Sequence, residues 1–133
     1  MIIKSNNDYQ EVNRYLKKFI LSNEASSFDE IQATIFKKIH QLDEVPFNSD
    51  WNYLMILVQR IEEQFGFDEF VSESNYFRFQ SGNSGEYQSI QDKQPTKMEA
   101  IYSCCVLAVK EYWKEGKAIP YSRGGEPFDI NDL

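Results

Sequence analysis

The broadest apolar pattern in the chain lies between Thr96 and Glu115, and it predicts a central helix over residues 96–115. At about 100° per residue, apolar side chains cover well over half of the helical circumference, and polar ones share a narrow strip. Thr96 and Glu99 have the spacing of a capping box, and Gly116 is a suitable stop. A helix this apolar is usually buried on more than one side, so we expect the other elements to pack around it.

Three earlier stretches repeat apolar residues at the spacing of a single helix face, which predicts three amphipathic helices. Their expected ranges are 8–21, 28–42 and 50–65. Each stretch is preceded by side chains suited to cap a helix: Asn7 or Asp8 for the first, Ser27 with Glu30 for the second, and Asn48 or Ser49 for the third. Pro46 separates the second helix from the third, and Gly66 is suited to end the third.

Between residues 67 and 91 the period changes from that of a helix to an alternation typical of strands. Phe77 and Phe79 alternate with Tyr76 and Arg78, and the turn cluster 81–85 follows. The segment therefore predicts an antiparallel sheet of two or three strands. The expected fold class is α+β, with about four helices packed with this small sheet and the third and fourth helices lying on it together.

The length of 133 residues suits one domain with a real core. We expect a single α+β domain over residues 1–116 and an irregular C-terminal tail over residues 117–133. The tail is rich in glycine, proline and acids, yet it contains scattered apolar residues. That composition predicts a segment that is either loosely docked or ordered by a partner.

The charge of the chain limits its partners and its compartment. A net charge of −7 argues against direct binding of nucleic acid through a phosphate-attracting surface. Seven of the acids lie between Glu62 and Asp92, where Arg78 is the only base. The central helix is too short and too charged at its ends to span a membrane, and the N-terminal sequence lacks a signal peptide. With two adjacent cysteines, this predicts a cytoplasmic protein without membrane association.

Two motifs in this pattern carry a resemblance to a known group of proteins. The first motif consists of Trp51, Leu54, Met55, Val58, Ile61 and Glu62. The second consists of Thr96, Lys97, Glu99, Ala100, Tyr102, Val106, Lys110, Tyr112 and Trp113. Together they resemble small uncharacterised proteins encoded by phages, prophages and related mobile elements of gut bacteria. The resemblance covers about half of the chain. It implies an α+β fold and a mobile-element context in the cytoplasm, and it carries over no catalytic residue.

The sequence contains no recognisable catalytic, cofactor-binding or metal-binding constellation. Cys104 and Cys105 lie among apolar neighbours with no base nearby in sequence, which predicts inert, buried thiols rather than a redox pair. With His40 as the only histidine, the chain has too few ligands of this kind for a zinc site. His40 itself falls near the end of the second helix, where we expect a structural or solvated role.

Glu62 is the charged residue that an amphipathic third helix does not explain, because it falls at the edge of the apolar face. Desolvation there raises the pKa of a carboxyl group, and Arg78, Tyr76 or Lys97 is its expected partner. The many aromatic residues favour either a core packed under the sheet or a binding surface. The candidate functional or interaction residues are Glu62, Tyr76, Arg78, Tyr87 and Trp113.

Three functions are compatible with these patterns. The first is a non-enzymatic accessory protein of a phage or mobile element that binds another protein. The second is an acidic inhibitor that mimics nucleic acid and occupies a host nuclease or DNA-binding protein, which requires the acids to share one exposed face. The third is a small enzyme that uses Glu62 or the clustered acids with a divalent metal.

Overall fold

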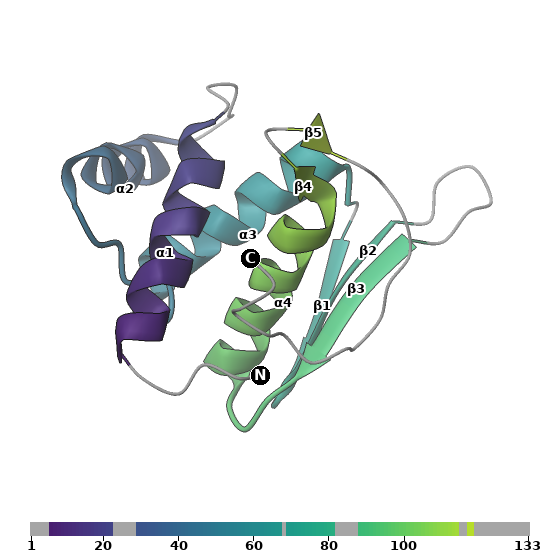
Figure 1. Cartoon of the computed structure of the whole chain (residues 1–133). Helices are drawn as coiled ribbons and strands as arrows, with labels where there is room; N and C mark the ends of the chain where they lie inside the picture. The colour runs from purple at the N-terminus through teal and green to yellow at the C-terminus, as the bar shows by residue number, and fades with distance from the viewer. Residues whose placement is uncertain (1–5, 23–28, 68, 82–87, 115–116, 119–133) are drawn as a thin grey trace.

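The computed structural model describes residues 6–22, 29–67, 69–81, 88–114 and 117–118. It confirms an α+β fold with four helices and a three-stranded antiparallel sheet (Figure 1). The elements are α1 (Asn6–Leu21), α2 (Glu30–Gln41), α3 (Trp51–Phe65), β1 (Glu69–Glu73), β2 (Tyr76–Ser81), β3 (Gln88–Lys93), α4 (Lys97–Tyr112), β4 (Trp113–Lys114) and β5 (Lys117–Ala118). The tail expected over 117–133 lies outside the described residues, apart from Lys117 and Ala118.

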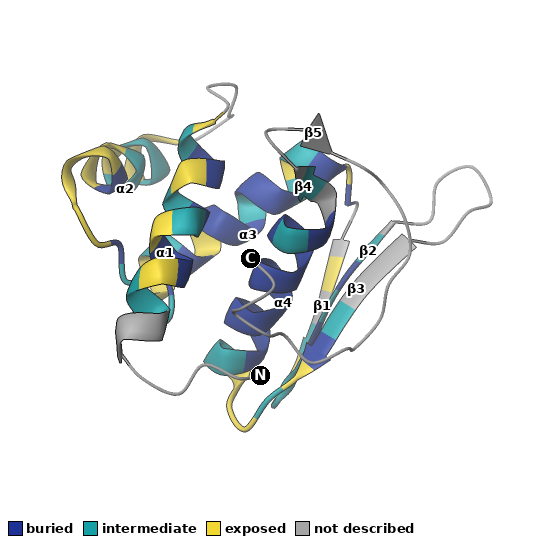
Figure 2. Ribbon diagram, in the orientation of Figure 1, coloured by how far each residue is buried: buried dark blue, intermediate teal, exposed yellow. Residues whose placement is uncertain are grey.

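Helix α4 is the centre of the fold, as its apolar arc predicts. It packs with one side against the sheet and with the other against α3 and α1. Every residue from 101 to 109 is buried (Figure 2). The expectation that α3 and α4 lie on the sheet together was wrong, because α3 packs chiefly against α4 and α2. Since α4 is apolar around most of its circumference, it fills the layer between the sheet and the other helices.

The first two helices begin at residues other than those expected. Asn7 and Asp8 already lie inside α1. Asp29 caps α2 in a capping box with Gln32: its carboxylate accepts from the Gln32 N–H over 2.8 Å, and its own N–H donates to Gln32 Oε1 over 3.2 Å. Ser27, the expected cap, lies outside the described residues. Both Ser27 and Asp29 have suitable side chains, so the difference depends on where the backbone turns helical.

The sequence predicted the N-terminal cap of α4 correctly but not that of α3. Asp50, rather than Asn48 or Ser49, caps α3, and its carboxylate accepts from a first-turn backbone N–H over 2.9 Å. Thr96 caps α4 as predicted, because its hydroxyl oxygen accepts from the Glu99 N–H over 3.2 Å. Asn48 is instead used in a tertiary contact, which the local sequence does not reveal.

The two long C-terminal helices end in different ways. Gly66 ends α3 in the left-handed conformation, with φ of 73°, as expected for a glycine stop. Helix α4 ends at Tyr112, earlier than expected, because the backbone becomes extended at Trp113 and pairs with Ala118. Gly116, the expected stop for α4, lies outside the described residues.

The sheet has the order β1-β2-β3, and both pairings are antiparallel. The predicted alternation separates its faces: Phe77 and Phe79 are fully buried, whereas Tyr76 and Arg78 alternate with them on the other face. Since α4 packs against β2, we place the phenylalanines on the face that meets α4. Of the expected turn 81–85, residues 82–85 lie outside the described residues.

Candidate functional site

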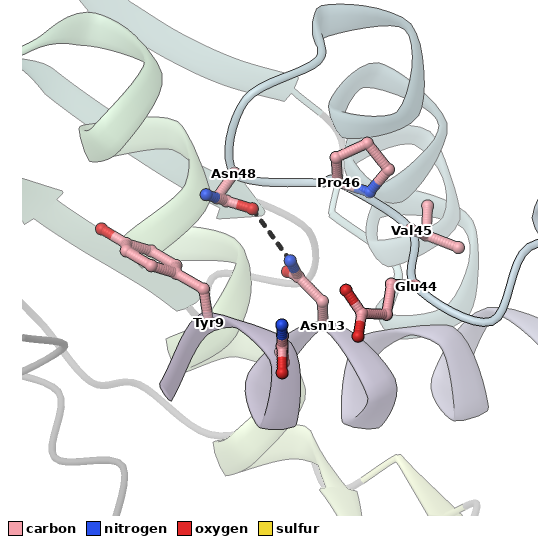
Figure 3. Close-up of a pocket in the computed structure, with 7 residues that line it drawn as sticks. Tyr9, Asn13, Glu44, Val45, Pro46 and Asn48 are labelled. Atoms are coloured by element: carbon pink, nitrogen blue, oxygen red, sulfur yellow. Dashed lines mark hydrogen bonds between the residues drawn. The ribbon is translucent and has the colours of Figure 1, made fainter. Parts of the chain in front are cut away.

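A pocket of about 320 Å³ opens between α1 and the connection from α2 to α3 (Figure 3). The first half of α1 and the connection supply its walls, which consist of Tyr9, Gln10, Asn13, Glu44, Val45, Pro46 and Asn48. Glu44 is exposed at this site, whereas Asn13 is only 6% exposed. The pocket therefore combines a solvent-accessible carboxylate with a buried amide.

A chain of hydrogen bonds holds the buried amide of Asn13 in place. Tyr102 on α4 donates its hydroxyl hydrogen to Asn13 Oδ1 over 2.8 Å. Asn13 Nδ2 in turn donates to Asn48 Oδ1 over 2.8 Å (Figure 3). Burial, with a smaller contribution from Tyr9, raises the pKa of Tyr102 well above 10, so its hydroxyl remains a donor at any physiological pH. The pocket wall is thus positioned by two helices and a connection that are distant in sequence.

Tyr9 adds an aromatic wall with a negatively charged neighbour. Its ring centroid lies 5.8 Å from that of Tyr102, with the two rings tilted by 31°. Burial raises the pKa of Tyr9, and the negative charge of Glu99 raises it further. The Glu99 carboxylate therefore contributes a negative potential at the Tyr9 side chain.

Most of the side chains that line the pocket can form hydrogen bonds. Among the described residues that line the pocket, Glu44 is the only acidic or basic one, and the amides of Gln10, Asn13 and Asn48 supply further polar groups. Carboxylate and amide oxygens accept hydrogen bonds, and the described residues that line the pocket include no Ser, Thr, Cys, Lys or His. Within the described residues, no three His, Cys, Asp or Glu side chains gather in an arrangement that could hold a metal ion.

A second polar cluster lies between the sheet and α4, at Asp92. The Asp92 carboxylate accepts from the Ser103 hydroxyl, from Gln94 Nε2 over 3.1 Å and from the Lys93 N–H over 2.8 Å. Asp92 is 6% exposed and Ser103 is fully buried. Because the carboxylate has several donors and is almost fully buried, this cluster connects β3 to α4 rather than forming a substrate site.

Glu62 lies where the sequence placed it and is desolvated as expected, but among the described residues the expected partners Tyr76 and Arg78 do not bind it. Its side chain is half-buried, and burial raises the pKa of the carboxyl group, with Glu63 raising it further. Its charge contributes to the raised pKa of Cys105, so it faces α4. The expected partner Tyr76 donates instead to Gln91 Oε1 over 2.6 Å. No hydrogen bond or ion pair joins Glu62 to Arg78 within the described residues.

The other aromatic candidates have different surroundings. Trp113 is half-buried, and its ring packs against Tyr15 at a centroid distance of 5.3 Å and against Phe19 at 5.7 Å. These contacts give Trp113 a role in joining the end of α4 to α1. Tyr76 is also half-buried, on the sheet face opposite the buried phenylalanines. Tyr87 lies outside the described residues.

Both cysteines are free, fully buried thiols, as predicted. Burial raises the pKa of each well above its ordinary value. Cys104 bonds to the backbone of Phe79 in the sheet, whereas Cys105 is influenced by the charge of Glu62 on α3. The two thiols therefore face different neighbours. His40 is exposed, and its ring forms a T-shaped pair with Phe36 at a centroid distance of 5.0 Å.

The acids between residues 62 and 92 do not share one described face. Asp92 is buried against α4, while Glu62 and Glu63 lie on α3 and Glu73 lies at the end of β1. Asp68 and Glu86 lie outside the described residues, as does the side chain of Glu69. Because Asp92 is buried, it cannot belong to an exposed acidic surface that imitates nucleic-acid phosphates.

Several apolar residues within the predicted amphipathic helices 28–42 and 50–65 are exposed. Trp51 is 45% exposed and Met55 is 37% exposed, and both lie on α3. On α2 and at its end, Ile31 is 74% exposed and Leu42 is 36% exposed. The sequence showed the apolar stripes but not how much of each stripe a neighbouring element covers. No helix among the described residues is both long enough and apolar enough to cross a membrane.

Comparisons of the chain with protein families, with curated proteins and with solved structures found no match.

Proposed function

We propose that this chain is a non-enzymatic accessory protein of a phage or related mobile element, which binds another protein in the cytoplasm. The observation that carries the proposal is the exposure of Trp51 and Met55 on α3. The resemblance of two helical motifs to phage and mobile-element proteins supports the context. The buried, reduced cysteines fit a cytoplasmic compartment.

Trp51 and Met55 are four residues apart on one helix, so their side chains are neighbours on the same face. Tryptophan and methionine are both enriched at protein interfaces, and tryptophan is common among residues that dominate binding energy. Methionine adapts its shape to irregular partner surfaces. Removing this pair from water gives a partner a favourable contribution on the order of 1–3 kcal/mol.

The buried thiols support the non-enzymatic part of the proposal. Burial raises the pKa of both Cys104 and Cys105, so neither is a thiolate at neutral pH. Ser103, the other nucleophile type beside them, is fully buried and donates to Asp92. A substrate has no access to these three groups in the folded protein.

The test is affinity capture from gut bacteria that carry the element, followed by measurement of binding with the purified captured protein. The double variant Trp51→Asn/Met55→Gln is expected to weaken binding at least about tenfold. The control is Ile31→Asn, because Ile31 is equally apolar and even more exposed. Ile31 is next to Gln32, whose side chain donates to Gln59 on α3. Gln59 is eight residues from Trp51, or about 12 Å along the helix, so Ile31 lies away from the Trp51 and Met55 face.

Circular dichroism and thermal melting check that both variants stay folded. Equal binding by the double variant and the Ile31→Asn control would overturn the proposal. So would light scattering that shows a strict monomer with no captured partner. Self-association that the double variant abolishes would identify a second copy, not another protein, as the occupant of this face.

A further inference from the structure

We infer that the pocket between α1 and the α2–α3 connection receives an arginine side chain of the partner protein, an inference that rests on the proposed function. The first reason is charge. Glu44 is the only acidic or basic residue among the described residues that line the pocket, and it is exposed. The whole chain carries a net charge of −7, so the surrounding field also attracts cations.

The aromatic wall favours a guanidinium group among cations. Tyr9 lines the pocket and is half-buried, so its ring is held against Tyr102 rather than moving freely in solvent. Arginine stacks its planar head on an aromatic face while its donors remain in the plane and reach neighbouring acceptors. The negative charge of Glu99 beside Tyr9 strengthens the attraction for a cation at this position.

The amides supply acceptors around the same space. Gln10, Asn13 and Asn48 line the pocket, and each has a side-chain carbonyl oxygen. The Oδ1 atoms of Asn13 and Asn48 each already accept one hydrogen bond, which leaves each of them one lone pair. Figure 3 shows the Glu44 carboxylate and the Asn48 amide on either side of Asn13. An arginine side chain has five N–H donors in a fixed fork, so it can bond to the carboxylate and to an amide oxygen at once.

One basic side chain of α1 near the pocket, that of Lys17, is already engaged. Lys17 lies one helical turn beyond Asn13, and its Nζ donates to the Leu42 carbonyl oxygen over 2.5 Å. No ion pair between Lys17 and Glu44 occurs within the described residues. The Glu44 carboxylate is therefore available to an incoming cation. A volume of about 320 Å³ is at the small end of ligand pockets, which suits one inserted side chain.

The experiment is a titration of the ¹⁵N-labelled full chain with N-acetyl-arginine methylamide, followed by NMR. Chemical-shift changes are expected at the backbone amides of residues 9–13, 44–45 and 47–48, with a dissociation constant on the order of millimolar. The matched probe is N-acetyl-citrulline methylamide, which keeps the shape of arginine without its charge. We expect the citrulline probe to bind about fivefold more weakly.

The variant Glu44→Gln is expected to weaken arginine binding by about three- to fivefold. The control is Glu11→Gln, which removes an exposed acid from α1 that does not line the pocket. Equal binding of the arginine and citrulline probes would overturn the inference, as would unchanged binding by Glu44→Gln. Shift changes scattered over the whole surface would overturn it as well.

The two proposals fail separately. Trp51 does not line the pocket, so the Trp51→Asn/Met55→Gln variant is expected to bind the arginine probe as the wild type does. A captured partner that depends on Trp51, with no response to the arginine probe, would contradict only the pocket inference. Binding of the arginine probe without any captured partner would contradict the proposed function. It would show only that the pocket binds a guanidinium group.

Discussion

The hydroxyl group of Tyr102 on α4 donates to Oδ1 of Asn13 on α1 over 2.8 Å, although the two residues are 89 positions apart. Both side chains are buried. Nδ2 of Asn13 in turn donates a hydrogen bond to Oδ1 of Asn48, in the connection before α3. One short chain of hydrogen bonds therefore positions α1, α4 and that connection relative to one another, and it holds a wall of the pocket.

Removal of the Tyr102 hydroxyl is expected to destabilise the fold. The variant Tyr102→Phe leaves Asn13 Oδ1 buried without its donor, which costs about 1–2 kcal/mol of unfolding free energy. Urea denaturation measures the loss. Tyr53→Phe is the control, because the Tyr53 hydroxyl makes no hydrogen bond within the described residues. Equal losses in the two variants would mean that the Tyr102 bond adds nothing specific.

The Asp92–Ser103 pair is expected to behave as one coupled unit. Asp92→Ala leaves the buried Ser103 hydroxyl and the Gln94 amide without this acceptor, at a cost of about 2–4 kcal/mol. Ser103→Ala costs less, because Asp92 keeps its other donors. A double-mutant cycle by urea denaturation is expected to give a coupling energy of about 1–3 kcal/mol. Strictly additive losses would show that the two side chains act independently.

Glu62→Gln is expected to stabilise the protein at neutral and higher pH. Burial raises the folded-state pKa of Glu62 above the ordinary 4.5, so the folded state holds the proton more tightly than the unfolded chain. The ionised carboxylate therefore destabilises the fold. This cost develops as the pH rises through 4.5 and is complete above the raised pKa; it is absent at lower pH, where both states are protonated.

Urea denaturation at about pH 8 and about pH 3.5 measures the effect of Glu62→Gln, with the gain present only at the higher pH. Glu73→Gln is the charge-matched control, because Glu73 is an exposed acid at the end of β1. A gain of equal size at both pH values would assign the effect to packing rather than to the charge.

The two cysteines are expected to resist thiol reagents in the folded protein. Cys104 and Cys105 are fully buried, and burial raises the pKa of both thiols. Reaction with a coloured disulfide reagent at about pH 8 is expected to be at least about a hundredfold slower in buffer than in denaturant. Rapid labelling of either thiol in buffer would show that α4 becomes exposed without global unfolding.

The helices and strands could be predicted because they depend on local patterns. The apolar arc of α4 is wide enough to require burial on several sides, and Thr96 stands directly before its first turn. The alternation around Phe77 and Phe79 specifies a strand with one buried face. At the start of α3 we expected Asn48 or Ser49 as the cap, whereas Asp50 is the cap, because the local pattern does not identify the residue at which the backbone becomes helical.

The buried positions of polar residues could not be predicted with the same success. Arg60 is 1% exposed and donates from Nη2 to the Ile20 carbonyl oxygen at the end of α1, although it stands outside the apolar stripe of α3. Ser103 belongs to the polar strip of α4 in the sequence but meets Asp92 in the fold. The partner of each side chain lies on another element. The position of Arg60 or Ser103 in the helical pattern therefore does not predict that the side chain is buried.

The sequence alone determined the α+β class, the central helix and the inert setting of Cys104 and Cys105, since local periodicity and composition control these features. Only the tertiary structure decided that α3 packs on α4, that Trp51 stays exposed, and that Asn13 meets Tyr102 beside a pocket. The physical reason is that the coverage of an apolar face and the partner of a polar group both depend on residues far away in the chain.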